Sequence, residues 1–229
     1  MSAAKILMIV TSHATMGDSG RTTGVWFEEL STPYYTFVDA GVHVDIASIA
    51  GGPVPFDPHS IDAEADQPAS VRRFRNDAHA MQQVEASKKI DDVDAAPYSA
   101  IFLPGGHGTM WDLPASTKLA RLLSDAWSQN KVLAAVCHGP AGLVNVKDAN
   151  GQPLVAARKV TGFSNSEEEA AGLTHAVPFL LEDRLRSLGA QYVSAADFQP
   201  HAIRDGKLVT GQNPASSEEA ARLTLQAIA

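Results

Sequence analysis

The chain has 229 residues, of which 45% are hydrophobic and 19% charged, a composition typical of a globular protein with a sizeable core. Its net charge of −8 and the absence of any Lys/Arg run argue against nucleic acid or an anionic membrane as a partner. A single cysteine excludes an intrachain disulfide, and the chain shows neither a signal-peptide pattern nor an apolar run of roughly 20 residues, so we expect a cytoplasmic protein without a membrane span.

Apolar runs of strand length alternate with helical patterns along the chain. The runs predict strands over residues 5–10, 42–50, 98–103, 131–136, 154–160, 191–194 and 207–210. Amphipathic spacing and capping residues predict helices over residues 24–40, 71–89 and 116–130, and two more that begin near residues 166 and 216. This alternation predicts an α/β fold, a parallel sheet covered by helices on both faces.

Particular residues mark the expected helix boundaries. Thr22 or Thr23 should cap the first helix, and Pro33 should kink or break it. Ser166 and Glu169 have the spacing of a capping box at the start of a later helix.

Residues 53–92 do not fit the alternation. Prolines near the start of this segment predict an excursion over the surface, followed by the helical piece over residues 71–89. No repeat, low-complexity stretch or linker divides the chain. We therefore expect a single domain over residues 1–229, with 53–92 as a candidate lid or interface insertion.

The strand over residues 131–136 runs directly into Cys137, the only cysteine. Ala135 and Gly139, two residues before and after it, provide the small neighbours that a nucleophile on a tight strand-to-helix turn requires. Free N–H groups and the dipole at the start of a following helix would favour the reactive thiolate. Cys137 is therefore the candidate nucleophile, whereas a buried, inert cysteine is the alternative.

Other chemistry-bearing residues are expected near Cys137, because ligand sites of open α/β sheets lie beyond the carboxyl ends of the strands. His138 is the expected proton acceptor, and Glu168, in a run of three glutamates, is the best candidate to orient its second ring nitrogen. The alternative for all three glutamates is that they only stabilise the helix, by a favourable interaction with the dipole at its N-terminus. Glu29 lies at the edge of an apolar stripe, where burial would raise its pKa and enable proton exchange; an ordinary surface acid is the alternative.

The turn at residues 104–108 follows another strand and reads Pro-Gly-Gly-His-Gly. The backbone N–H groups of Gly106 and His138 are the expected donors to a developing oxyanion, and His107 is expected to line the pocket. The alternative is a tight turn without a catalytic role. The histidines do not have the spacing of metal ligands, so we expect no metal site. No phosphate-binding glycine motif follows the first strand.

Five segments together resemble the DJ-1/PfpI superfamily. They are residues 23–29 (TGVWFEE), 104–109 (PGGHGT), 134–140 (AAVCHGP), 160–163 (VTGF) and 209–216 (VTGQNPAS). They span nearly the whole chain in the right order. Within the superfamily, the likeness is greatest to the Hsp31-like branch, glutathione-independent glyoxalases that are also described as holding chaperones.

The resemblance implies a flavodoxin-like sandwich, a homodimer and no dissociable cofactor. It implies Cys137 as nucleophile with His138 as its partner, Glu29 in contact with the cysteine, and Glu168 as the triad acid, with a slip of one residue left open. The implied reaction converts methylglyoxal, a small 2-oxoaldehyde, to lactate, with His138 or Glu29 moving a proton through an enediolate. A deglycase activity is a further implication.

Two other functions remain open at this point. The first is a glutamine amidotransferase-like amidase or peptidase, although those amidotransferases place an acid two residues after a late histidine and His201 has none. The second is a non-enzymatic, redox-responsive chaperone that uses oxidation of Cys137.

Overall fold

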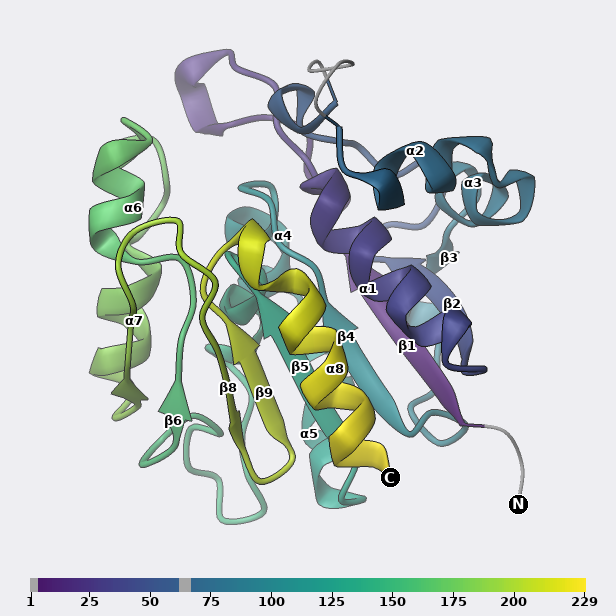
Figure 1. Ribbon diagram of the computed structural model, residues 1–229. Helices are drawn as coiled ribbons and strands as arrows, with labels where there is room; N and C mark the ends of the chain where they lie inside the picture. Colours follow the sequence, from purple (N-terminus) through teal and green to yellow (C-terminus); the bar gives the residue numbers. More distant parts are fainter. Residues whose placement is uncertain (1–3, 62–66) are drawn as a thin grey trace.

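The computed structural model describes residues 4–61 and 67–229, and Figure 1 shows their arrangement. Within these residues, seven strands form one sheet, in which all neighbours pair in parallel except the last two. In spatial order the strands are β3 (Lys88–Lys89), β2 (His43–Ser48), β1 (Lys5–Val10), β4 (Ala100–Leu103), β5 (Val132–Val136), β9 (Leu208–Gly211) and β8 (Ala202–Asp205). The predicted mostly parallel sheet is confirmed, and β8 is an antiparallel edge strand that the apolar pattern does not predict.

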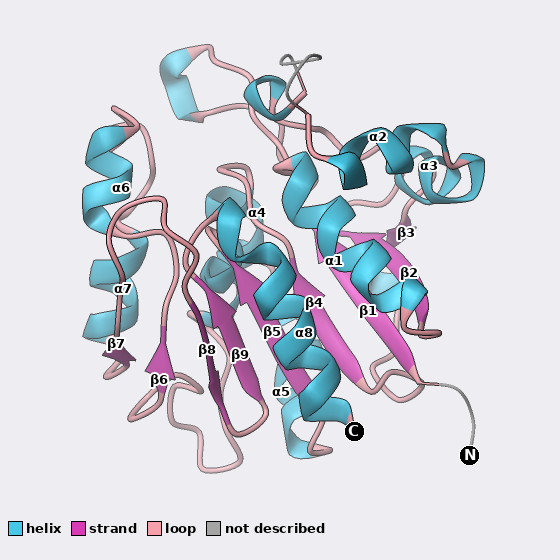
Figure 2. Ribbon diagram, in the orientation of Figure 1, coloured by secondary structure: helices cyan, strands magenta, loops and turns pink. Residues whose placement is uncertain are grey.

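Helices cover both faces of this sheet (Figure 2). One face carries α1 (Phe27–Asp39) and α8 (Ser217–Ile228), with α2 (Ala69–Asn76) and α3 (Ala78–Glu85) beyond α1; the other carries α4 (Thr109–Ala115) and α5 (Thr117–Ser128). None of the helices in the described part of the chain is long and apolar enough to cross a membrane.

A hydrophobic core lies on each side of the sheet, and β1 contributes to both. Leu7 and Ile9 pack into the core under α4 and α5, whereas Ile6, Met8 and Val10 pack into the core under α1 and α8. Successive side chains of a strand point to opposite faces, so a strand buried on both faces must be apolar throughout. This explains why the strand at 5–10 is a continuous apolar run.

A smaller unit lies beside the β8 edge of the main sheet, where Figure 1 shows it in green. It contains β6 (Lys159–Val160) paired in parallel with β7 (Gln191–Tyr192), together with α6 (Asn165–Ala170) and α7 (Leu181–Ser187). The strand predicted over residues 154–160 is therefore wrong except for its last two residues. Leu154 and Val155 are buried in turns, so their apolar character reflects packing rather than strand pairing.

The first helix differs from its prediction at its start and at its proline. It begins at Phe27 rather than residue 24, because the Thr23 hydroxyl donates to the Asp57 carboxylate (2.9 Å) instead of capping the helix. Pro33 is buried and α1 continues through it to Asp39, so the predicted break is absent.

The segment 53–92 is only partly described, because residues 62–66 lie outside the described part. The single helix predicted over residues 71–89 is wrong: the chain forms α2 and α3, separated at Asp77. The Asp77 carboxylate accepts hydrogen bonds from the backbone N–H groups of His79 and Ala80, at 3.0 and 3.1 Å, and so starts a new helix.

Candidate active site

Cys137 follows β5 directly and adopts a left-handed backbone conformation with φ of +58°. Such a conformation is rare for a residue with a side chain and persists only where the surrounding structure holds it. Here the Cys137 N–H donates to the Gly211 carbonyl (2.9 Å), and a Cβ added to Gly139 would lie 2.2 Å from the Leu103 carbonyl oxygen. The predicted strand-to-helix elbow is present, with glycine required at the crowded position.

The segment after the elbow is the short 3₁₀ helix η4 (Gly139–Leu143), and the thiol itself is buried. Burial raises the pKa of the Cys137 thiol well above its ordinary value, and the neighbouring Glu29 raises it further. Burial therefore opposes the resting thiolate that a helix N-terminus is expected to favour. The sulfur needs a base, and Sγ lies 3.2 Å from Nδ1 of His138.

Glu168, in the first turn of α6, bridges two histidines. One carboxylate oxygen lies 2.8 Å from Nε2 of His138 and the other lies 2.8 Å from Nε2 of His107, and the two imidazole rings are 4.1 Å apart between centroids. Burial opposes ionisation of Glu168, but the two histidines outweigh it and hold its pKa far below the usual range. Burial, reinforced by His107, lowers the pKa of His138.

Glu29 belongs to α1, is completely buried and interacts with Cys137. Its Oε2 accepts a hydrogen bond from the Gly105 N–H (2.8 Å), whereas Oε1 is buried without a close hydrogen-bond partner in the described residues. The carboxyl group also interacts with the Cys137 thiol. Burial raises the pKa of Glu29 to about 8, against the opposing effect of the hydrogen bonds from Cys137 and Gly105. The carboxyl group therefore carries a proton at neutral pH, and the reading as a surface acid is excluded.

The glycine turn after β4 packs against the elbow. Gly106 has φ of +100°, and a Cβ there would lie 2.3 Å from the Gly24 carbonyl oxygen. The Thr109 hydroxyl lies 2.8 Å from the Gly106 carbonyl oxygen and 3.1 Å from that of His138, so it ties the two turns together. Neither Gly106 nor His138 donates its N–H to a backbone carbonyl in the described residues, although the His138 N–H is directed at the Cys137 sulfur and lowers the pKa of the thiol.

The three consecutive glutamates have three different environments. Ser164 is the N-cap of α6 and forms a capping box with Glu167, so the predicted box of Ser166 and Glu169 is wrong. Glu169 is exposed, whereas Glu167 and Glu168 are buried. The spacing of Ser164 and Glu167 was a usable signal, because it is the same three-residue spacing.

Glu167 also holds one rim of the site in place. Its Oε1 accepts hydrogen bonds from the Phe198 backbone N–H and the Asn213 side-chain amide, both at 2.8 Å. Phe198 has φ of +59° and its side chain is 50% exposed. Glu167 is thus a structural carboxylate that fixes the Phe198 turn at the edge of the cavity.

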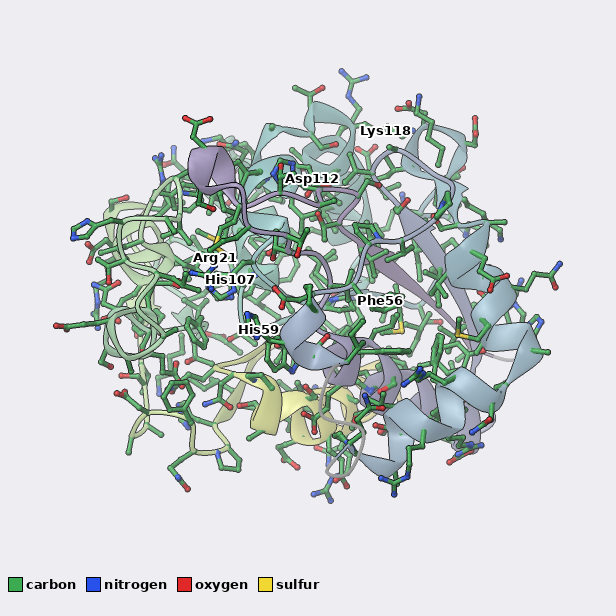
Figure 3. The ribbon with its side chains drawn as sticks, turned by 90° about the horizontal axis from the view of Figure 1, so that it is seen from above. Arg21, Phe56, His59, His107, Asp112 and Lys118 are labelled. Atoms are coloured by element: carbon green, nitrogen blue, oxygen red, sulfur yellow. The ribbon has the colours of Figure 1, made fainter. Side chains whose placement is uncertain are left out.

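Cys137 opens into a cavity of about 420 Å³ with mainly apolar walls. Figure 3, seen from above, shows three of its polar residues, Arg21, His59 and His107, near one another. The cavity is lined by Met16, Arg21, Trp26, Asp57, His59, Gly106, His107, Cys137, His138, Phe163, Ala171, Leu173, Phe198 and Pro214.

The ligand atoms of His107, His138 and Glu168 lie within 4.8 Å of one another, so these three residues form a set that could hold a metal ion. They come from three separate segments, and no local spacing reveals them. The carboxylate already satisfies one nitrogen of each imidazole, so proton sharing alone accounts for the arrangement.

With this geometry established, the chain can be compared with known proteins. Residues 22–227 match the DJ-1/PfpI family. The chain belongs to the DJ-1/PfpI family. The Cys137 elbow and the Gly105–Gly106 turn are among the segments that carry the family likeness in the sequence.

Relatives within the DJ-1/PfpI family align over nearly the whole chain. Glutathione-independent glyoxalase hsp3101 of Schizosaccharomyces pombe is 33% identical over 98% of this chain and 96% of its own. Glutathione-independent glyoxalase HSP31 of Saccharomyces cerevisiae is 32% identical over 100% of this chain and 99% of its own. Among solved structures, Rapid Encystment Protein 24 KDa of Francisella tularensis has a TM-score of 0.94 and 42% identity over 99% of both chains. Glyoxalase III of Candida albicans has a TM-score of 0.89 and 28% identity, over 98% of this chain and 97% of its own.

Proposed function

We propose that this chain is a glutathione-independent glyoxalase that converts methylglyoxal to lactate through a covalent intermediate on Cys137. The observation that carries the proposal is the position of one sulfur between a base and an acid. Nδ1 of His138 lies 3.2 Å from Sγ, and the protonated Glu29 interacts with the same thiol. The full-length likeness to relatives named glutathione-independent glyoxalases supports the same reaction.

The first step is addition of the sulfur to the aldehyde. His138 accepts the thiol proton on Nδ1, and Glu168 stabilises the imidazolium that forms. Sγ bonds to C1 of methylglyoxal, and the negative charge that develops on the aldehyde oxygen is met by the N–H groups of Gly106 and His138. Glu29 then donates its proton to this oxygen, which gives a hemithioacetal.

The second step is an internal oxidation and reduction within the substrate. A base removes the proton from C1, which leaves an enediolate, and a proton is then added at C2. The product is a thioester of lactate on Cys137. Water hydrolyses the thioester, releasing lactate and the free thiol, so glutathione is not required as a thiol carrier.

The cavity is consistent with a small dicarbonyl substrate. Its walls as a whole are mainly apolar, and a cavity of about 420 Å³ holds a three-carbon aldehyde with room to spare. Exclusion of water from this apolar space strengthens the hydrogen bonds to the oxyanion.

Other properties stay proposals. The family resemblance supports a homodimer and a stress-protective chaperone or deglycase role, and the sequence pattern supports a single domain and a cytoplasmic location. Asp57 and His59, in the segment 53–92, line the cavity, which supports a lid role for the start of that segment.

The test is lactate formation from methylglyoxal without glutathione, for the wild type and for Cys137→Ser. We expect steady turnover by the wild type and background levels for the variant, because a neutral hydroxyl is a far weaker nucleophile than a thiolate. Thermal unfolding of both proteins controls for folding, since the two side chains are nearly isosteric. Lactate formation by Cys137→Ser at the wild-type rate would contradict the covalent step.

A further inference from the structure

The proposed reaction needs a base for the proton on C1, and His138 is not free to be that base. Its Nδ1 faces Sγ at 3.2 Å and its Nε2 faces Glu168 at 2.8 Å, so both ring nitrogens are engaged. Once it has accepted the thiol proton, it is an imidazolium and has no lone pair left.

Glu29 is not free either. Its Oε2 holds the Gly105 N–H, and the buried carboxyl group has its own proton near neutral pH. In the proposed first step it gives that proton to the aldehyde oxygen, and the carboxylate that results is then engaged by the hydroxyl group that it has just formed. Neither of the two bases that the sequence suggests therefore remains for the C1 proton.

His107 has the free lone pair that the step requires. Glu168 is ionised, so the nitrogen facing it on each histidine must carry the hydrogen. Both imidazoles are therefore fixed as Nε2–H tautomers with an Nδ1 lone pair. Nδ1 of His138 is used by the sulfur, whereas Nδ1 of His107 has no partner in the described residues and is not among their enclosed polar atoms.

The position of His107 and its charge state also fit. It lines the cavity together with Cys137, and its ring lies 4.1 Å from that of His138. One carboxylate compensates one positive charge, so His138 must release its proton to the substrate as His107 accepts the proton from C1.

We propose that His107 is a further catalytic residue, whose Nδ1 takes the proton from C1 of the hemithioacetal and returns it to C2. The C1–H bond breaks, its electron pair forms the C1–C2 double bond of the enediol, and the C2 oxygen takes the proton that His138 holds. The proton on Nδ1 of His107 then forms the C2–H bond as C1 becomes the thioester carbonyl and its hydroxyl proton returns to the carboxylate of Glu29. Delivery from one side gives lactate of a single handedness. This inference rests on the proposed glyoxalase function.

The test variant is His107→Gln, which can keep a donor toward Glu168 but has no titratable nitrogen. The matched control is His13→Gln: His13 is half-buried and stacks on Trp111 at 5.1 Å between ring centroids, and it neither contacts Glu168 nor lines the cavity. The measurements are kcat and KM for methylglyoxal, the isotope effect with C1-deuterated methylglyoxal, the handedness of the lactate, and the rate of Cys137 alkylation by iodoacetamide.

We expect His107→Gln to lower kcat roughly 10²- to 10⁴-fold, with KM and the alkylation rate close to the wild type. Its isotope effect should increase and its residual lactate should lose handedness, while His13→Gln matches the wild type throughout. An unchanged kcat, or a fall in kcat matched by an equal fall in alkylation, would overturn the role of His107. A wild type that forms no lactate would instead refute the proposed function, which distinguishes the two failures.

Discussion

Two buried carboxylates flank the elbow, and they have opposite protonation states. Glu29 on α1 is buried with one backbone N–H and a thiol as neighbours, and its pKa is raised to about 8. Glu168 on α6 is also buried, yet two imidazoles face its two oxygens and its pKa is lowered far below the usual range.

The difference shows that partners, rather than burial, decide the charge of a buried acid. Desolvation acts on both groups in the same direction, and only Glu168 has two imidazole partners whose interactions with the carboxylate outweigh it. Pairs of acids whose environments separate their pKa values divide the roles of acid and base in many active sites. Here Glu29 retains a proton that it can donate, and Glu168 remains a carboxylate that holds two histidines by hydrogen bonds.

Of the variants at these two carboxylates, the one that removes the charge of Glu168 should lower kcat the most. Glu168→Gln keeps the shape but removes the carboxylate that fixes the tautomers of both histidines. We expect kcat for methylglyoxal to fall about 10³- to 10⁴-fold, with the fold retained. Steady-state kinetics and a thermal melt measure both quantities. A variant with near wild-type kcat would show that the histidines need no ionised partner.

Glu167 tests whether a buried acid next to Glu168 must be catalytic. Glu167→Ala leaves the N–H of Phe198 and the amide of Asn213 without their acceptor, and should lower the free energy of unfolding by about 3 kcal/mol. Glu169→Ala, at an exposed neighbour, should change it by less than about 0.5 kcal/mol. Chemical denaturation of the two variants measures the difference. Equal values would contradict the capping box at Glu167.

Glu29→Gln keeps a neutral group in place of the neutral acid but removes its transferable proton. We expect a fall in kcat of roughly 10²-fold. Wild-type activity should decline as pH rises through about 8, where Glu29 loses its proton, and this alkaline limb should be absent in the variant. The pH profile of kcat measures both features, and an unchanged rate with an unchanged limb would remove Glu29 from the mechanism.

The same acid should make the stability of the protein depend on pH. Above pH 4.5 Glu29 ionises in the unfolded chain while the folded chain keeps the proton until about pH 8, so the folded state binds more protons in this window. Stability of the wild type relative to Glu29→Gln should therefore fall as pH rises, by about 2 kcal/mol between pH 5 and pH 7. Denaturation at the two pH values measures it, and a difference that is constant with pH would contradict the raised pKa.

The sheet and the elbow could be predicted from the sequence because both follow from local patterns. A strand buried on both faces must be a continuous apolar run, as at 5–10 and 131–136. A nucleophile on a tight turn needs small neighbours, and Gly139 meets this need in the structure. The residues that gather around Cys137 were also found, because strand ends meet at one edge of a parallel sheet.

The electrostatic character of the site could not be predicted, because it depends on contacts between distant segments. Glu29 keeps its proton because α1 carries its carboxyl group into a completely buried position, where burial outweighs the hydrogen bond from the Gly105 N–H. Glu168 bridges two histidines that lie 61 and 30 residues before it in the sequence, a relation no spacing encodes. Two elements are missed for a related reason. The Asp77 side chain starts a new helix and so separates α2 from α3, and β8 is held as a strand by its antiparallel pairing with β9. Neither effect is visible in the local apolar pattern.

The most direct test of the central claim, covalent chemistry on Cys137, is mass spectrometry of the wild type quenched in acid during turnover of methylglyoxal. We predict that the peptide bearing Cys137 gains the mass of one methylglyoxal, as hemithioacetal or lactate thioester, and that the gain disappears once substrate is consumed. Rapid lactate formation with an unmodified Cys137 peptide at every time point would contradict the account.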